Sequence, residues 1–240
     1  MDFNVRNFAV FDIGGFEVWL TETVVNTWII MALLIVAAII VRVRLSGFGD
    51  VPKGLQNVVE FMVETFSGFV KNTAGEKLQY LGGWFFSAFA FIFIASISGV
   101  FALRPPTADW ATTFAFALAT FILIQILGLR YQRLGYLKGF LAPDFKLNLP
   151  NVLASLLFTP LNIIGELARP VSLSFRLFGN ILAGMILMNM LYALTPVYVQ
   201  LFVPVPLHAY FDIAMAFLQT YIFIVLSLSF VGTASEVSAE

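Results

Sequence analysis

The stretch LARPVSLSFRLFGNILAG, residues 167–184, places two arginines in one of the most apolar parts of the chain. Arg169 and Arg176 stand among aliphatic and aromatic residues that continue to Met190. An arginine at mid-membrane depth costs about 2.5–3.5 kcal/mol on insertion scales, and its guanidinium stays protonated at physiological pH. The stretch therefore predicts a membrane helix whose permanent positive charge serves a function.

The composition of the whole chain predicts an integral membrane protein. The 240 residues are 60% hydrophobic and 11% charged, whereas soluble domains have about 45–50% and 25%. Long apolar runs favour bundled helices over a β-barrel, whose segments are short and alternating. We therefore expect an all-α polytopic membrane protein, with residues 1–240 forming a single membrane domain.

The same composition argues against several other classes of protein. A net charge of −1 gives no sign of nucleic-acid binding. The chain has no cysteine and one histidine, so we expect neither a metal site nor a cofactor. The acidic N-terminus lacks the basic and apolar regions of a cleavable signal peptide.

Five segments are apolar enough to cross a bilayer, which takes about 20 residues. They are 23–41, 82–103, 110–129, 149–194 and 208–232. The fourth is too long for one perpendicular span and contains Pro160 and Pro170, so we expect it to be tilted and bent. Between the first two, apolar residues from Leu55 to Val70 recur at helical spacing. This pattern indicates an amphipathic helix at the cytoplasmic interface or against a partner, with a soluble-type connecting helix as the alternative.

The basic residues of the loops predict the orientation. The alternate loops carry only Arg104, so the two basic loops are expected to be cytoplasmic, with the N-terminus outside and the C-terminus inside. The basic loops contain Arg42, Arg44, Lys53, Lys71 and Lys77 after the first span, and Arg130, Arg133, Lys138 and Lys146 after the third.

The polar residues of the fourth segment fall on one helical face, because they recur every three or four positions. On this face Arg169 is close enough to the cytoplasmic end to act as an interface anchor or as a charge at a channel mouth. Arg176 lies deeper, and it pairs either within the chain or with a functional partner. Glu166 is ten residues from Arg176, about 15 Å along a straight helix, which is too far for contact unless the helix bends. The stripe comprises Asn162, Glu166, Arg169, Ser172, Arg176, Asn180 and Gly184.

The last span carries a second polar stripe. Asp212 and Gln219 are seven residues apart and share a helical face. Asp212 starts near the outer side, beside His208, and Gln219 reaches about the depth of Arg176. We therefore expect the fourth and fifth spans to be antiparallel neighbours with facing stripes.

Two polar approaches would then meet at one permanent charge. The outer approach descends past His208 and Asp212, and the cytoplasmic approach rises past Asn162, Glu166 and Ser172. An arginine repels a cation that comes straight through and attracts a carboxylate. The arrangement suits a mobile carboxylate that loads an ion on one side and releases it on the other. This chain does not supply that group, so we expect an obligate partner with a buried Asp or Glu.

These residues resemble subunit a, the ion-channel stator subunit of rotary F-type ATP synthases. The resemblance covers nearly the whole chain and is weakest in the first 20 residues. Its motifs are PLNIIGELARPVSLSFRLFGNILAG (160–184), FLQTYIFIVLSLSFVG (217–232) and RPPTADWATTFAFALATF (104–121).

The resemblance implies roles for individual residues. Arg176 matches the essential stator arginine that faces the carboxylate of each subunit c. Gln219 and Asn180 match residues near that arginine, with Asn180 lining the outer half-channel. Ser172 matches a polar position on the cytoplasmic approach, and the cytoplasmic acid falls at Glu166 or, in other members, at the position of Asn162.

One departure from the family affects the outer half-channel. Many bacterial members have Glu after the glycine equivalent to Gly184, paired with a histidine on the last helix. This chain has Met185 and Asp212 there. We therefore expect Asp212 to be the outer carboxylate, with His208 either assisting it or incidental.

The resemblance also implies the setting of the protein. It would be a non-catalytic proton-channel subunit in a bacterial plasma membrane. Its partners would be the subunit c ring, the subunit b peripheral stalk, the rest of the synthase and membrane lipid. We expect H⁺ as the coupling ion and leave Na⁺ open, because the ring carboxylate site sets the choice.

Two other classes of function are less consistent with the residues. An intramembrane hydrolase needs a nucleophile with a base or metal ligands, and neither H-E-x-x-H nor G-x-S-x-G occurs here. A self-sufficient transporter would work without a partner, so the chain reconstituted alone would distinguish it. A purely structural scaffold does not account for a deep arginine between two polar stripes.

Overall fold

The described residues of the computed structural model form a bundle of membrane helices. Five helical segments are long and apolar enough to cross a membrane: Glu22–Arg44, Glu76–Phe101, Trp110–Gln132, Thr159–Leu194 and Pro204–Ser235. The predicted helical membrane class and its five spans are thereby confirmed. The structure describes residues 7–13, 16–45, 47, 53–101, 103–133, 135–136, 149–200 and 202–236.

The elements follow one another in an order that the sequence largely predicts, including the helix between the first two spans. They are α1 (Glu22–Leu45), α2 (Leu55–Ala74), η1 (Glu76–Leu81), α3 (Gly82–Ile97), η2 (Ser98–Phe101), η3 (Pro106–Ala108), α4 (Trp110–Gln132), α6 (Leu149–Leu194), α7 (Val197–Gln200), α8 (Pro204–His208), η4 (Ala209–Ala214) and α9 (Met215–Glu236). Lys138, Lys146 and the C-terminal residues 237–240, which entered the orientation prediction, lie outside the described residues.

An N-terminal β-hairpin precedes the first span and was not predicted. Strand β1 (Asn7–Ile13) pairs antiparallel with β2 (Phe16–Thr21), and Ile13 lies opposite Phe16. Both strands contain Val and Phe, and β2 also contains Trp19; these residues favour extended backbone. The hairpin leads directly into α1 at Glu22.

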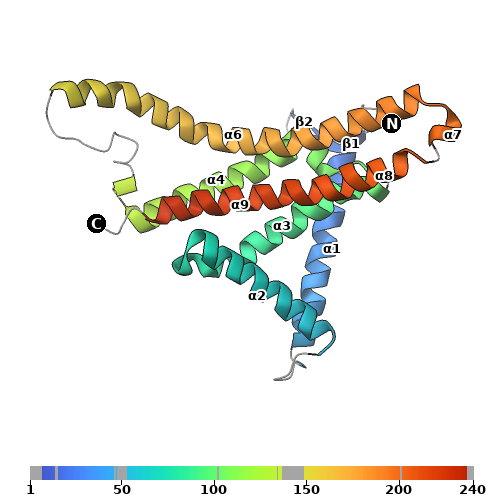
Figure 1. The fold of residues 1–240 in the computed structure, drawn as a ribbon, viewed down its shortest axis with the longest axis horizontal. Coiled ribbons are helices and arrows are strands. Elements are labelled where there is room, and N and C mark those ends of the chain that lie inside the picture. The colour runs from blue at the N-terminus through green and yellow to red at the C-terminus, as the bar shows by residue number, and fades with distance from the viewer. Residues whose placement is uncertain are drawn as a thin grey trace.

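Helix α6 is one continuous helix of 46 residues with Pro160 and Pro170 inside it. At 1.5 Å per residue it is about 69 Å long, more than twice the roughly 30 Å hydrocarbon core of a bilayer. Figure 1 shows α6 bent near its middle, with α9 running beside it in the opposite direction and α1 running steeply away from α6. The predicted bend of the fourth span and its antiparallel pairing with the fifth are therefore present, and its tilt in the membrane stays a prediction.

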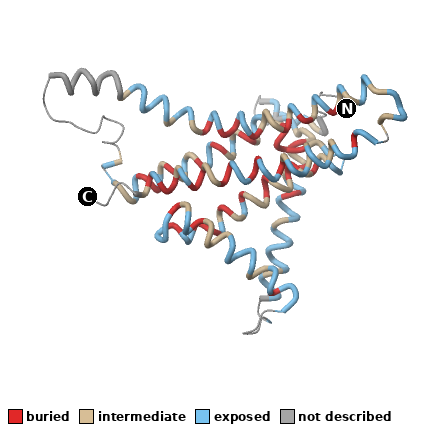
Figure 2. Tube along the Cα trace, viewed as in Figure 1, coloured by how far each residue is buried: buried red, intermediate tan, exposed pale blue. Residues whose placement is uncertain are grey.

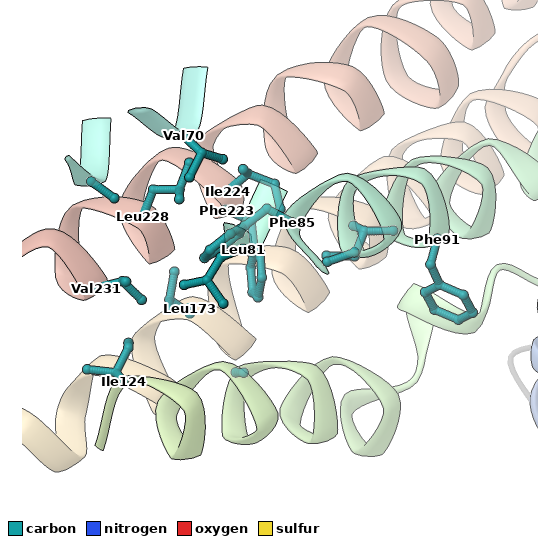
Figure 3. Packing of buried hydrophobic residues seen from close by; sticks show 14 of the residues in the cluster. Val70, Leu81, Phe85, Phe91, Ile124, Leu173, Phe223, Ile224, Leu228 and Val231 are labelled. Carbon is teal, nitrogen blue, oxygen red and sulfur yellow. The ribbon is translucent and has the colours of Figure 1, made fainter. Parts of the chain in front are cut away.

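The core lies where α3, α4, α6 and α9 meet, and buried residues gather there in Figure 2. Figure 3 shows Phe85, Ile124, Leu173 and Phe223 among the apolar side chains of this cluster. Fully burying a side chain of this size contributes about 1.5–3 kcal/mol. This packing holds α6 and α9 in fixed register, which the polar side chains between them require.

Helix α2 is packed at its C-terminal end and exposed at the other. Val70 is fully buried, and a Cβ at Gly232 of α9 would lie 3.3 Å from Cα of Ala74, so the two backbones touch. In its first half, Val58 and Phe61 are 56% and 67% exposed. The predicted amphipathic helix is therefore present, and its free apolar half suits a lipid interface.

Candidate functional site

Arg176 projects from the open side of α6. Its residue is exposed, and it has no hydrogen bond or ion pair with any other described residue. The neighbours Leu173 and Leu177, three residues before it and one after, are 4% and 1% exposed and anchor the helix in the core. The arginine therefore sits on the border between the packed and the open side of a firmly held helix.

Small residues line the open side of α6 on both sides of Arg176. A Cβ added at Gly165 or Gly179 would meet nothing within 4 Å, so no described side chain packs against the helix at these two positions. Arg176 stands between Ser172 and Gly179 and is a long side chain flanked by small ones. We call the small residues Gly165, Ala168, Ser172, Gly179 and Ala183 the small-residue row.

Asn180 and Gln219 join α6 to α9 one turn beyond Arg176. The Nδ2 of Asn180 donates to Oε1 of Gln219 at 2.5 Å. Gln219 is 2% exposed, and its Nε2 has no hydrogen-bond partner among the described residues. A buried amide N–H left unpaired costs about 1–3 kcal/mol, so this atom is a site for a water or a ligand oxygen.

Asp212 belongs to a cluster of three polar side chains near the C-terminal end of α6. Nδ1 of His208 lies 2.5 Å from Oδ2 of Asp212, and Oη of Tyr192 lies 3.1 Å from Nε2 of the same imidazole. Asp212 is in η4, a π-helical turn, and such turns are frequent at functional sites. We call Asp212, His208 and Tyr192 the Asp212 cluster.

Glu166 belongs to a second cluster, on the other side of Arg176. Its carboxylate accepts from Nη1 of Arg169, with contacts of 2.9 Å and 2.8 Å to Oε1 and Oε2, and from Nε2 of Gln125 at 3.1 Å. Cζ of Arg169 also lies 4.7 Å from the ring centre of Phe230. We call Glu166, Arg169 and Gln125 the Glu166 cluster.

Tyr136 packs beside the Glu166 cluster. Its ring lies where a Cβ of Gly128 would be, with the ring atoms 2.6–2.8 Å from that position. Burial raises the pKa of the Tyr136 phenol above its ordinary value, and the charge of Glu166 adds to the shift. The phenol therefore stays neutral over the physiological range.

The structure brings most of the predicted site residues into contact and leaves three exposed. Asn180 meets Gln219, and His208 meets Asp212. Asn162, Ser172 and Arg176 face outward from α6. Arg169, expected as an anchor or a mouth charge, is an ion-pair partner of Glu166. Glu166 and Arg176 are ten residues apart on α6 and form no ion pair with each other.

Sequence reasoning missed Gln125, Tyr136 and Tyr192. Gln125 and Glu166 are 41 residues apart, and Tyr192 and His208 are 16 residues apart, so neither contact follows from the spacing within one helix. Within the described ranges, no group of three or more His, Asp or Glu side chains is arranged to hold a metal ion.

The comparisons with known proteins agree on one family. The model of the family described as ATP synthase A chain matches residues 24–232. ATP synthase subunit a of Moorella thermoacetica is 36% identical over 234 residues, covering 95% of this chain and 96% of the relative. Similar relatives include ATP synthase subunit a 2 of a Bradyrhizobium species, 35% identical over 94% of the chain and 92% of the relative. Another is named ATP synthase subunit a, sodium ion specific, from Propionigenium modestum, 34% identical over 90% and 74%.

Proposed function

Since the chain belongs to the ATP synthase subunit a family, we propose that it forms two offset half-channels separated by Arg176, which load and unload a rotor. The family is a non-catalytic, ion-translocating part of the membrane sector of the synthase. ATP is formed on other chains, so the chemistry of this subunit is transfer of an ion.

The single observation that carries the proposal is the exposed, unpartnered guanidinium of Arg176. An unpaired charge facing lipid is costly, whereas a carboxylate at about 4 Å attracts it by roughly 4 kcal/mol at an effective dielectric constant of 20. The partner is therefore an acidic group on another chain, and we assign it to the carboxylates of a subunit c ring.

The small-residue row supports the same partner. Gly165, Ser172 and Gly179 have side chains that let another helix approach the α6 backbone closely, as small residues do between membrane helices. A ring helix could pass along this row with only Arg176 reaching toward it. The subunit b peripheral stalk, the rest of the synthase and lipid cover other surfaces.

The outer half-channel runs past Asp212 to Asn180 and Gln219. Asp212 is partly exposed and its side chain is 22% accessible, while Gln219 is buried. The free Nε2 of Gln219 binds a water or the incoming rotor carboxylate. His208 adds a second exchangeable group at the mouth.

The cytoplasmic half-channel runs past Asn162, Glu166 and Ser172. Asn162 and Ser172 are exposed, and Glu166 lies between them in sequence with an 11% accessible side chain. Arg169 holds that carboxylate in place. In this assignment the N-terminus is outside a bacterial plasma membrane, the C-terminus is cytoplasmic, and the ion is H⁺.

The test replaces Arg176 in the assembled complex. We expect Arg176→Ala to abolish ATP-driven proton pumping in inverted membrane vesicles while the complex still assembles. Arg44→Ala, at the exposed end of α1, is the matched control and should pump normally. Coupled pumping at the normal rate in Arg176→Ala would reject the proposal.

A further inference from the structure

The Asp212 cluster forms a continuous hydrogen-bonded row that begins on α6 and ends on η4. Tyr192 contacts His208 through its hydroxyl, and His208 contacts Asp212 through its other nitrogen. Exposure falls along this row: Tyr192 is 41% exposed, the side chains of His208 and Asp212 are 37% and 22% exposed, and Gln219 beyond them is 2% exposed. The row therefore points from solvent or headgroups toward the interior.

We propose that this row is the proton entrance of the outer half-channel, and that Tyr192 is the residue that positions His208 in it. The inference rests on the function proposed above, because it assigns the mouth of the same channel. It adds Tyr192, which does not follow from the polar stripes, and gives His208 a defined part.

The chemistry of the imidazole suits a bridge between two partners. In the neutral ring one nitrogen donates and the other accepts. With the proton on Nδ1, the ring donates to Asp212 and Nε2 accepts from the Tyr192 hydroxyl. The phenol thus favours the tautomer whose N–H faces the carboxylate. In other histidines too, the hydrogen bond made by one ring nitrogen sets the protonation of the other.

One proton then crosses the ring in balanced steps. The Tyr192 hydroxyl turns its proton away from Nε2, and a hydronium at the mouth gives its proton to that nitrogen and becomes water. The ring becomes an imidazolium, whose Nε2–H donates to the phenol oxygen of Tyr192. The imidazolium gives the Nδ1 proton to Oδ2 of Asp212, which becomes a neutral acid. The ring now carries its single proton on Nε2, and rotation of the ring or proton exchange with water restores the starting tautomer.

The local fold holds Tyr192 for this purpose. Nε2 of Gln200, on α7, donates to the carbonyl oxygens of Tyr192 and Thr195 at 2.8 Å and 2.7 Å. These bonds satisfy carbonyls at the end of α6 that have no helical partner. The rings of Tyr192 and His208 are tilted at 40° with centres 6.1 Å apart, so the hydroxyl makes the contact rather than ring stacking.

The experiment is a double-mutant cycle in inverted vesicles that contain the assembled complex. Tyr192→Phe removes only the hydroxyl, and we expect ATP-driven proton pumping, normalised to assembled complex, to fall about threefold. His208→Gln should reduce pumping about tenfold. Combining both should lower pumping no further than His208→Gln alone, because Tyr192 acts through the imidazole. Tyr198→Phe, a 70% exposed tyrosine on α7, is the matched control and should have no effect.

Each outcome decides between positioning and a structural role. Normal pumping in Tyr192→Phe, or an equal loss from that change in the wild-type and His208→Gln backgrounds, would overturn the inference. If His208→Gln fails to assemble, His208→Asn serves in the same cycle. The proposed function is judged separately by Arg176→Ala. If Arg176→Ala abolishes pumping while Tyr192→Phe pumps normally, the proton entrance at Tyr192 is rejected and the proposed function stands.

Discussion

The Glu166 cluster and the Asp212 cluster lie on opposite sides of Arg176, and they hold their carboxylates in different ways. Glu166 is bound by a guanidinium and an amide, Arg169 and Gln125, neither of which takes up or releases a proton. Asp212 is bound by an imidazole, which in turn meets a phenol. One cluster has a single exchangeable group, and the other has three.

This difference suggests how one chain can give its two half-channels different tasks. A carboxylate fixed by a permanent charge provides a defined position with constant electrostatics. A carboxylate hydrogen-bonded to an imidazole can receive a proton through that ring. We infer that the Asp212 cluster passes protons along a chain of side chains, whereas the Glu166 side relies on water reaching its exposed neighbours Asn162 and Ser172.

The largest expected effect separates the two acids. Asp212→Asn should reduce ATP-driven proton pumping about 100-fold, within the range by which general acids and bases contribute. Glu166→Gln keeps an acceptor for Gln125 and should cost only about tenfold. Pumping is measured in inverted vesicles and normalised to assembled complex. The comparison fails if the two substitutions cause equal losses; Asp212→Glu, which keeps the carboxylate, should retain most of the activity.

Much of the fold follows from the sequence because its signals are local. Apolar length marks the five spans, and the predicted polar face of the last span is confirmed at Gln219, which meets Asn180 of α6. The N-terminal hairpin also had a local signal, the Gly14–Gly15 pair between two strand-like runs. It was missed because the sequence was searched for long apolar runs, and a short hairpin before a membrane helix does not form one.

The clusters were less predictable because they depend on packing between distant segments. His208 and Asp212 are four residues apart, so their contact was within reach of a helical argument. Tyr192 meets His208 because the chain turns back after α6 and brings His208 to the end of that helix. Gln125 meets Glu166 because α4 presents the face that carries Gln125 to α6. Neither the turn after α6 nor the packing face of α4 can be recognised from a local sequence pattern.

A smaller effect tests whether Arg169 is the permanent partner of Glu166. Arg169→Gln should reduce pumping about fivefold and lower thermal stability by on the order of 1–2 kcal/mol. This value is below the 3–5 kcal/mol of a fully buried pair because the Arg169 side chain is 35% exposed. The temperature at which vesicles lose half their pumping measures the change. Arg169→Lys keeps the charge and should recover most of both losses; equal damage from the two variants would mean that packing on Phe230 matters more than charge.

The smallest effect concerns the packing beside the Glu166 cluster. In Gly128→Ala the new methyl group meets the Tyr136 ring, and the ring must rotate away from its place near Glu166. Because a ring can move where backbone could not, the cost should stay under about 2 kcal/mol and pumping should fall less than twofold. Gly83→Ala is the matched control, since a Cβ there meets nothing within 4 Å, and it should be neutral or stabilising by up to about 1 kcal/mol. The measurement is the temperature at which vesicles lose half their pumping, compared between Gly128→Ala and Gly83→Ala. A Gly128→Ala protein as stable as Gly83→Ala would show that Tyr136 contributes nothing to holding Glu166, and that Arg169 and Gln125 alone fix this acid.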